Sequence, residues 1–372
     1  MSWFRKGRVV GLLLSIVLAL IVAGCGGNNN NAPESSPPPA SPSPPASESP
    51  ASESPSPSPS ESPSETPKDL VKVKFSEVIR SIFYAPHYIA MSKGFFAEEG
   101  LEIDMNTAQG SDKGAAALIA GTADISLVGP ETTIYIYNQK GEKTLKLFYQ
   151  LTMKDGSFLL SRDKLDSFDW SGLSGKKVIG WRPGSAPQMV LNSTLLKEKI
   201  EGADVVTNIA STAMAGAFAS GQGDYIQLFE PVASTLIKEG KAYYAASLGE
   251  AYGEFPETSY VATSDYIANH PEIIQKVVNA VAKATAWLET ASDAEIAEAL
   301  KPFFEGTSDD IIISSIKRYK DQQTWPAKPE MTLELFETLQ GVLIENGVLK
   351  PEEKIADMSA VVDMSFVQKI NS

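Results

Sequence analysis

Apolar and polar positions along this chain alternate between two periods, which is typical of a fold that mixes strands and helices. Three strand-like runs each lead into a helical pattern: the runs span residues 71–78, 101–106 and 125–128, and the helices span 88–99, 111–120 and from 131 onward. Strands that alternate with helices usually form a mainly parallel sheet with crossover helices. We therefore expect the loops after these strands to gather at one sheet edge, where ligands bind in open α/β folds.

The alternation returns after residue 142 with a second set of elements. Strand-like runs lie at 143–151, 158–161, 177–181, 204–208, 225–229 and 259–263, and helical patterns lie at 186–200, 213–220 and 231–239. Beyond Asp265 the pattern is helical throughout, with starts marked by Pro271, Asp293, Ser308 and Thr332. One strand that leaves the first lobe and one that returns to it predict that the chain crosses between the lobes twice. The predicted boundaries are residues 69–155 plus 258–372 for lobe 1 and residues 156–257 for lobe 2.

Residues 1–24 have the pattern of an export signal. Three basic residues, Arg5, Lys6 and Arg8, precede an apolar run, and small residues then lead to Cys25. The run is shorter than the roughly 20 residues that a membrane-spanning helix needs. Its ending resembles a bacterial lipobox, so we expect Cys25, the only cysteine, to carry a palmitate-type lipid anchor on the extracytoplasmic face of the cell membrane. The alternative is a simple signal peptide followed by a stray thiol.

Residues 25–68 lack the material for a core. Thirteen of the 24 prolines lie between Gly26 and Lys68, and no apolar residue larger than Ala or Pro occurs there. Such a segment stays disordered, and its prolines favour an extended conformation, so we expect a stalk. The formal net charge is −14, and −17 without the three leader cations, which argues against nucleic acid as a partner.

The run from Lys177 to Met189 is the clearest candidate for a binding loop. Its apolar start ends in Gly180-Trp181-Arg182-Pro183-Gly184, and Ser185 then opens a helical pattern. A strand, a tight turn and a helix start place unpaired N–H groups and the positive end of a helix dipole at one spot. An ordinary connection between a strand and a helix has the same pattern, so the surroundings must decide between binding and structure.

Three further motifs carry a family resemblance. They are Phe83-Tyr84-Ala85-Pro86, the series SKGFFAEEGL from Ser92 to Leu101, and Gly121-Thr122-Ala123-Asp124-Ile125. Together they resemble the nitrate/sulfonate/taurine type of substrate-binding protein from ABC importers, over about residues 71–340. The resemblance implies an α/β fold of the type II periplasmic-binding-protein class, with two lobes, a two-strand hinge and a ligand cleft. It also implies a monomer that needs no cofactor and delivers a small-molecule ligand to a permease and an ATPase encoded elsewhere, and this chain has no Walker-type loop.

The resemblance assigns the run 177–189 to lobe 2, facing residues 109–112 and 129–132 across the cleft. Gly184 and Ser185 match the helix start that family members place against a polar ligand group, and Arg182 can pair with a sulfonate or carboxylate. The aromatic candidates for stacking are Trp181, Phe83, Tyr84 and Phe229, of which Phe83 and Phe229 are equally good core residues. The expected ligand-binding residues are Phe83, Tyr84, His87, Gln109, Ser111, Glu131, Thr132, Trp181, Arg182, Gly184, Ser185, Gln227 and Glu230.

Two acidic residues bear on the chemistry of the ligand. Glu131 and Glu230 each stand at a predicted helix start, where a carboxylate either favours the dipole or points into the cleft. If either faces the ligand, the ligand carries an amine or amidine, as in taurine or an aminopyrimidine of the kind bound by the thiamine-precursor branch of the superfamily. A sulfonate or taurine-like solute and an aminopyrimidine-like solute are both compatible with these residues.

Catalysis is the weaker interpretation. A thiamine-pyrimidine synthase in the same superfamily depends on a histidine and a cysteine-rich motif, whereas this chain has only His87, His270 and the leader cysteine. No nucleophile elbow or histidine-rich metal spacing occurs, so we expect no enzyme activity and no metal site. A cell-surface receptor or sensor that uses the stalk is the other alternative, and it predicts surface patches for a partner rather than an enclosed pocket.

Overall fold

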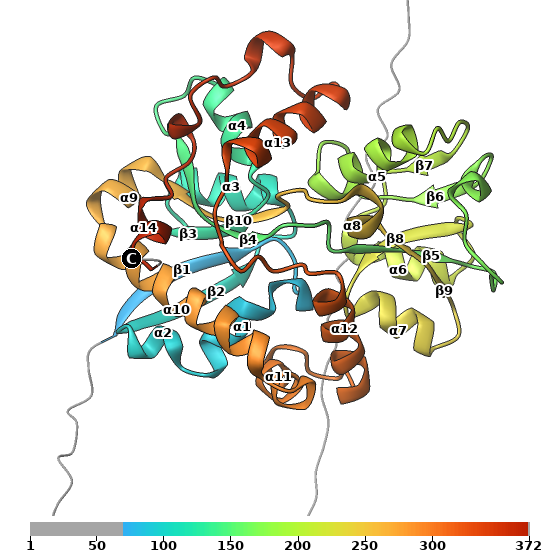
Figure 1. Cartoon of the computed structure of the whole chain (residues 1–372), viewed down its shortest axis with the longest axis horizontal. Helices are drawn as coiled ribbons and strands as arrows, with labels where there is room; N and C mark the ends of the chain where they lie inside the picture. The colour runs from blue at the N-terminus through green and yellow to red at the C-terminus, as the bar shows by residue number, and fades with distance from the viewer. Residues whose placement is uncertain (1–69, 371–372) are drawn as a thin grey trace, which may run out of the picture. The chain divides into compact units, whose positions relative to one another are not determined.

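The computed structural model describes residues 70–370, which form two α/β lobes, each built on a five-stranded sheet (Figure 1). The export signal, Cys25 and the stalk predicted from the sequence lie outside the described residues. The first sheet has the strand order β2-β1-β3-β10-β4, and the second has β7-β6-β8-β5-β9. Two chain segments connect the sheets, one between β4 and β5 and one before β10.

The first sheet contains β1 (Val71–Glu77), β2 (Leu101–Thr107), β3 (Ile125–Val128), β4 (Leu145–Thr152) and β10 (Thr258–Thr263). The second sheet contains β5 (Ser157–Ser161), β6 (Lys177–Ile179), β7 (Asp204–Val206), β8 (Tyr225–Phe229) and β9 (Tyr243–Ser247). These bounds confirm the predicted strands to within a few residues. The edge strand β9 was not predicted, because its Tyr-Tyr-Ala-Ala run has no alternating pattern.

The prediction of mainly parallel sheets is correct: four strands of each sheet run in one direction, and only β10 and β5 run against them. β2, β1 and β3 pair in parallel, as do β7, β6 and β8. β10 runs antiparallel to both of its neighbours, and so does β5. β5 and β10 run in the opposite direction because each directly follows a segment that arrives from the other lobe. The chain therefore enters the sheet from the opposite end.

The helices are α1 (Ala85–Ser92), α2 (Phe95–Glu98), α3 (Ser111–Ala120), α4 (Glu131–Asn138), α5 (Ala186–Lys197), α6 (Ser211–Ala219), α7 (Val232–Lys238), α8 (Leu248–Tyr252), α9 (Ser264–Asn269), α10 (Pro271–Thr290), α11 (Asp293–Leu300), α12 (Asp309–Asp321), α13 (Leu333–Glu345) and α14 (Ser365–Gln368), with short 3-10 turns that include η1 (Ile82–Tyr84). The helix predicted at 88–99 is two helices, because the chain turns at Gly94 with a positive φ of 76°. The helical pattern predicted beyond Asp265 is confirmed.

Helices cover both faces of the first sheet, with α1 and α10 on one face and α3 and α4 on the other (Figure 1). The long helix α10 shows why: Ile274, Val277, Val278 and Val281 are fully buried and recur with the spacing of one helix face. Each such side chain contributes roughly 1.5–3 kcal/mol by leaving water. The C-terminal helices reach the second lobe, since α12 contacts α7 and α13 contacts α5.

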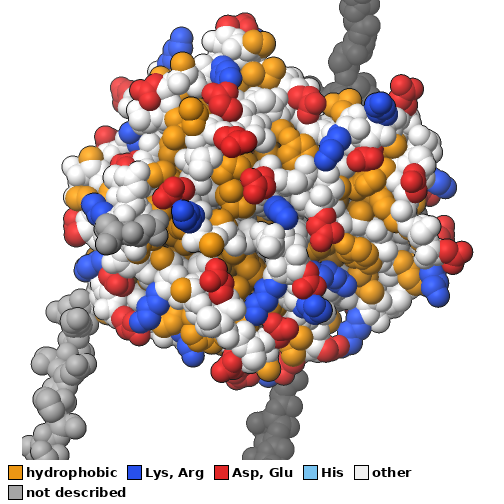
Figure 2. Space-filling view, viewed as in Figure 1, with side chains coloured by type: hydrophobic (Ala, Val, Ile, Leu, Met, Phe, Trp, Pro, Cys, Tyr) orange, Lys and Arg blue, Asp and Glu red, His pale blue; other side chains and the backbone are white. Residues whose placement is uncertain are grey.

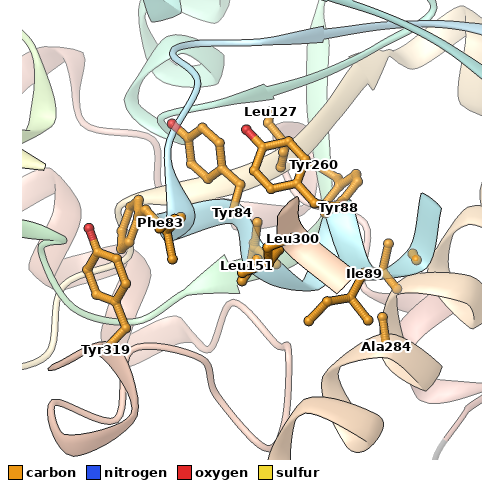
Figure 3. Packing of buried hydrophobic residues seen from close by; sticks show 14 of the residues in the cluster. Phe83, Tyr84, Tyr88, Ile89, Leu127, Leu151, Tyr260, Ala284, Leu300 and Tyr319 are labelled. Carbon is orange, nitrogen blue, oxygen red and sulfur yellow. The ribbon is translucent and has the colours of Figure 1, made fainter. Parts of the chain in front are cut away.

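A cluster of aromatic residues packs where the two lobes meet. The ring of Phe83 in η1 lies between Tyr84 and Tyr319 of α12, with ring centroids 5.6 Å and 5.5 Å away (Figure 3). The Tyr319 hydroxyl donates to the Gly156 carbonyl at 2.8 Å and accepts the N–H of Glu230 at 3.2 Å. Helix α12 therefore ties the first crossing segment to the end of β8.

The surface carries both signs of charge. On the face shown in Figure 2, acidic and basic side chains are interspersed over both lobes. Within residues 70–370, no helix combines the length and apolar character that a bilayer span requires.

Candidate ligand cavity between the lobes

A cavity of about 370 Å³ lies between the two sheets. Its walls come mainly from loops that follow β1, β2 and β3 in the first lobe and β6 and β7 in the second, with Phe229 at the end of β8. Because these are the parallel strands of each sheet, their carboxyl ends face the same space from both sides. The lining residues are Val78, Ile79, Tyr84, Gln109, Gly110, Ser111, Asp112, Lys113, Gly129, Trp181, Arg182, Ser185, Ala186, Pro187, Ile209, Ala210, Ser211, Thr212, Met214, Phe229, Glu257 and Thr258.

Aromatic rings form part of the wall. Trp181 packs edge-on against Phe229 with ring centroids 5.1 Å apart, and its indole N–H donates to the Gln227 carbonyl at 3.1 Å. Tyr84 lines the cavity from the first lobe, while the adjacent Phe83 is fully buried in the core. Rings fixed in this way offer a preformed apolar surface for a planar or aliphatic ligand body.

Arg182 is already paired in this structure. Its Nη2 lies 2.8 Å from Oδ1 of Asp112 on the opposite lobe, and both side chains are partly exposed, at 38% and 65%. The guanidinium packs on Gly110, where an added Cβ would lie 2.5 Å from the Asp112 carboxylate and 3.4 Å from Nη2 of Arg182. Gly110 has a φ of 152°, so glycine is favoured there both by space and by backbone conformation. The pair bridges the two lobes at the cavity.

The helix start after β6 is less open than its sequence suggests. The N–H and the hydroxyl of Ser185 both bond to the Arg182 carbonyl, at 3.3 Å and 2.8 Å. Gly184 has a φ of 74° and does not line the cavity, and its carbonyl accepts a bond from the Tyr135 hydroxyl at 3.3 Å. Ser185 therefore reaches the cavity with its polar groups already engaged, and Gly184 acts as a turn residue and a contact between lobes.

Gln109 and Ser111 of the first lobe lie at the cavity, where the sequence analysis expected them. Gln109 lines the cavity and holds a left-handed φ of 63°, which is uncommon for a residue other than glycine. Ser111 opens α3 at the cavity, and its hydroxyl accepts the N–H of Gly129 at 3.2 Å. The loops after β2 and β3 are joined by this bond.

Six expected site residues lie off the cavity lining besides Gly184: Phe83, His87, Glu131, Thr132, Gln227 and Glu230. His87 is fully buried, stacks on Phe75 and bonds to the Tyr260 hydroxyl at 2.8 Å, and burial lowers its pKa to about 3. Glu230 forms a buried ion pair with Arg318. The Gln227 side-chain amide donates to Ser157 and to the Pro187 carbonyl, both at 2.8 Å. These groups support the walls from behind.

Thr132 and Glu131 lie just behind the cavity. The Thr132 hydroxyl donates to the Gly129 carbonyl at 2.7 Å and closes the first turn of α4. The Glu131 carboxyl folds over Gly129, where an added Cβ would lie 2.0 Å from its Oε2. Burial raises the pKa of Glu131 to about 7, although the helix start and nearby Arg182 oppose the shift. Gly129, on which this carboxyl packs, lines the cavity.

Glu257 lines the cavity but was not among the site residues predicted from the sequence. It stands on the second crossing segment, is 4% exposed and lines the cavity, and its Oε2 accepts the Gly156 N–H at 2.8 Å. Asp155 on the first crossing segment lies beside it and is fully buried. The sequence contained a signal for this residue. An acidic residue directly before the strand that returns to lobe 1 lies on a crossing segment, and crossing segments border the cleft.

Met214 and the residues 209–212 were also missed, because the loop after the short strand β7 gives no periodic signal, whereas Asp112 lies in the run 109–112 that was expected to face the cleft. Among residues 70–370, no group of three or more His, Cys, Asp or Glu side chains is arranged to hold a metal ion. The chemistry that this lining offers is reversible capture, with apolar walls, one ion pair and one buried carboxyl.

Comparisons with known proteins agree with this geometry. Residues 82–293 match the family model described as NMT1/THI5 like. YtlA of Bacillus subtilis (strain 168), which is named as a binding protein, is 41% identical over 306 residues, covering 82% of this chain and 91% of YtlA. These matches confirm the resemblance to substrate-binding proteins drawn from the sequence motifs.

Solved structures show the same fold. The periplasmic nitrate-binding protein NrtA from Synechocystis PCC 6803 has a TM-score of 0.65 at 17% identity, over 81% of this chain and 88% of NrtA. The alkanesulfonate-binding protein SsuA from Xanthomonas axonopodis pv. citri, bound to MOPS, has a TM-score of 0.64 at 16% identity, over 78% of this chain and 98% of SsuA. The predicted two-lobe fold of the type II periplasmic-binding-protein class is therefore confirmed. The chain belongs to the NMT1/THI5-like family.

Proposed function

We propose that this protein is an extracytoplasmic solute-binding protein that captures a small organic solute and delivers it to the permease and ATPase of an ABC importer. The observation that carries the proposal is the cavity of about 370 Å³, which loops of both lobes build from opposite sides. Membership in the family and the likeness to YtlA support it. We place the lobe boundaries at residues 155/156 and 257/258, where the chain passes between the sheets.

The lining favours an organic solute over a small inorganic anion. Trp181, Tyr84 and Phe229 present more apolar surface than an ion such as nitrate can cover. A sulfonate or taurine-like solute would use Arg182, after Asp112 has released or shared it, whereas an aminopyrimidine-like solute would use the rings and a carboxyl. Both classes therefore belong in the search for the ligand.

We propose no catalytic role. His87, the only histidine near the predicted motif, is enclosed by Phe75 and Tyr260 and does not line the cavity. A general base must come within hydrogen-bond reach of the substrate, and a fully buried, bonded imidazole does not.

We also propose that the protein is anchored by a lipid on Cys25, at the extracytoplasmic face of the cell membrane, with residues 26–68 as a stalk. The support is the leader pattern of the sequence. The variant Cys25→Ser should move the protein from the membrane fraction to the soluble fraction. Retention of that variant in washed membranes would refute the anchor.

The solute proposal is tested by thermal unfolding of the full chain against sulfonates, taurine, aminopyrimidines and flavins. A true ligand at 100 times its dissociation constant stabilises the protein by about 2.7 kcal/mol. Trp181→Ala should remove most of this stabilisation, since the ring lines the cavity, whereas Trp170→Ala should keep it, since Trp170 packs on Phe168 away from the cavity. Equal stabilisation of both variants would place the ligand elsewhere, and no response to any solute would favour the receptor alternative.

A further inference from the structure

Three buried carboxyl groups of residues 70–370 that lie at the cavity or behind its wall form no ion pair. Glu131, Asp155 and Glu257 are at most 4% exposed, and among the described residues none of them forms an ion pair. The other two buried carboxylates of residues 70–370 each have an arginine: Glu77 pairs with Arg80, and Glu230 pairs with Arg318. A buried acid is costly unless it is paired or protonated, so the contrast requires an explanation.

The three groups have acceptor capacity left over. Oε2 of Glu131 has no hydrogen-bond partner. Oδ1 of Asp155 accepts the N–H of Ser157 at 2.8 Å and also its hydroxyl, while Oδ2 of Asp155 accepts no bond from a fixed donor. Glu257 accepts one backbone N–H and lines the cavity. Unfilled acceptors beside a cavity are what a positively charged hydrogen-bond donor would satisfy.

We propose that Glu257, supported by Asp155 and Glu131, is the subsite for a positively charged nitrogen group of the solute. The group is a protonated amine or an amidinium, carried by an apolar or aromatic body that lies against Trp181 and Tyr84. This inference rests on the proposed solute-binding function and narrows the class of solute. An organic cation suits the geometry better than a metal ion. Among the described residues Glu257 is the only buried carboxyl in the cavity lining, Asp112 is paired with Arg182, and a metal ion needs several ligands.

Binding of such a cation should release a proton. Burial raises the pKa of Glu257 well above its usual range, and the neighbouring Asp155 carboxylate raises it further. When the cation arrives, the Glu257 O–H bond breaks, the proton leaves to solvent, and the carboxylate pairs with the ligand nitrogen. Affinity for a permanently cationic probe should therefore increase with pH.

Other groups around Glu257 influence this step. The titratable and charged groups that face it are Asp155 on the first crossing, Glu131 of α4, Tyr84 of η1 and Tyr319 of α12, with Arg182 acting on Glu131 from the second lobe. Burial raises the pKa of both tyrosines, so they stay neutral at physiological pH. The remaining carboxyls disfavour ionisation of Glu257 until a cation is present, which makes the coupling to ligand stronger.

The test is calorimetric titration of the full chain with three probes of similar size: benzamidine, which is a planar cation, benzamide, which is its neutral counterpart, and benzenesulfonate, which is a planar anion. Benzamidine should bind at least about tenfold more tightly than benzamide, because only the cation pairs with the buried carboxyl. Its affinity should increase with pH across the neutral range, with proton release seen as a dependence of heat on the buffer. Equal binding of benzamidine and benzamide would overturn the inference.

The matched variants are Glu257→Gln and Glu254→Gln. The first keeps an acceptor for the Gly156 N–H and removes the charge, and the second changes an exposed acid three residues earlier, outside the cavity. Glu257→Gln should weaken benzamidine by more than about tenfold and abolish its pH dependence, whereas Glu254→Gln should change neither. An unfolding temperature near that of the wild type checks the fold of each variant, and unchanged benzamidine binding in Glu257→Gln would overturn the subsite.

Three further outcomes separate a failure of this inference from a failure of the proposed function. If benzenesulfonate binds in a way that depends on Trp181 and benzamidine does not bind, the solute-binding function stands and the cation subsite is wrong. If Zn²⁺ or Mg²⁺ binds in a way that depends on Glu257 and benzamidine does not, the carboxyls hold a metal ion and the inference is also wrong. If none of the probes binds, the cation subsite is rejected, while the thermal screen decides the function separately.

Discussion

The two charged regions of the cavity differ in how far water reaches them. At one, Arg182 and Asp112 bridge the lobes as a pair whose side chains are 38% and 65% exposed. At the other, Glu257, Asp155 and Glu131 are almost completely buried and have no cation among the described residues. Solvent screens the first region, so its two charges largely cancel and interact weakly with distant groups. The second region lacks that screening.

This difference changes which residue we expect to select the ligand. Arg182 is prominent in the sequence because it stands in a turn between a strand and a helix. In the structure it already has a partner, so an anion must displace or share Asp112. Within residues 70–370, the three buried carboxyls form no ion pair that a ligand would have to displace. Each unit of pKa shift in such a group corresponds to about 1.4 kcal/mol of difference in interaction between its two protonation states. The burial of a charged group, more than the charge itself, therefore determines how much that group contributes to the choice of ligand.

The largest effect should come from a buried carboxylate that loses its arginine. Arg318→Ala leaves Glu230 fully buried with only Ser234 as a polar partner, so unfolding should become easier by about 3 kcal/mol or more. Denaturant unfolding measures this. Lys317→Ala on the same helix removes only an exposed pair with Asp321 and should change little. Similar stabilities for the two variants would contradict the distinction between buried and exposed charge.

The next effect is a pH dependence that belongs to the buried region. Burial raises the pKa of Glu131 to about 7 from 4.5, so the folded state holds a proton that the unfolded chain loses above about pH 4.5. Its contribution to stability is greatest below that pH and decreases as pH rises to about 7, by roughly 3 kcal/mol. Glu131→Gln removes this decrease, so the variant should gain stability relative to wild type between pH 5 and about pH 8.

Measuring the difference between the two proteins isolates Glu131 from its neighbours. Burial also raises the pKa of Asp155, which acts in the same direction, and lowers the pKa of His87 to about 3, which acts in the opposite direction below about pH 6.5. Both groups are present in wild type and variant, so their contributions cancel. Parallel stability curves for the two proteins would show that Glu131 ionises as freely as an exposed acid.

The smallest effect should come from the exposed pair. Arg182→Ala should lower the free energy of unfolding by less than about 1 kcal/mol, because partly exposed ion pairs are worth little. We also expect benzamidine affinity to change by less than about threefold, since removal of the arginine acts only at a distance from Glu257. Calorimetric titration of this variant beside Glu257→Gln compares the two regions directly. A larger loss with Arg182→Ala would reverse their ranking.

Much of the fold could be predicted because its signals are local. Apolar periodicity and helix caps placed most strands and the C-terminal helices to within a few residues. The directions of β5 and β10 could not be read in this way, because periodicity carries no information on which end of a sheet the chain enters. The edge strand β9 has no alternating pattern, since part of it is exposed on both faces.

The residues of the candidate site show the same limit of prediction from sequence. Tyr84, Gln109, Ser111, Trp181, Arg182 and Ser185 line the cavity, and each stands in a loop after a predicted strand. His87 and Glu230 had equally suggestive positions beside turns, yet their side chains turn inward to Tyr260 and Arg318. Loop position predicted proximity to the cavity, while side-chain direction required the packed neighbours.

By itself the sequence determined the class of fold, the two crossings between lobes, the leader and stalk patterns, and the loops that border the cavity. Only the tertiary structure decided that Arg182 is paired with Asp112 and that Glu257, Asp155 and Glu131 are buried with no ion pair among the described residues. Periodicity and turn chemistry act between residues that are close in the chain, so the sequence shows them. Burial and pairing act between residues that lie far apart in the chain, as Asp155 and Glu257 do, and they exist only once the lobes have folded.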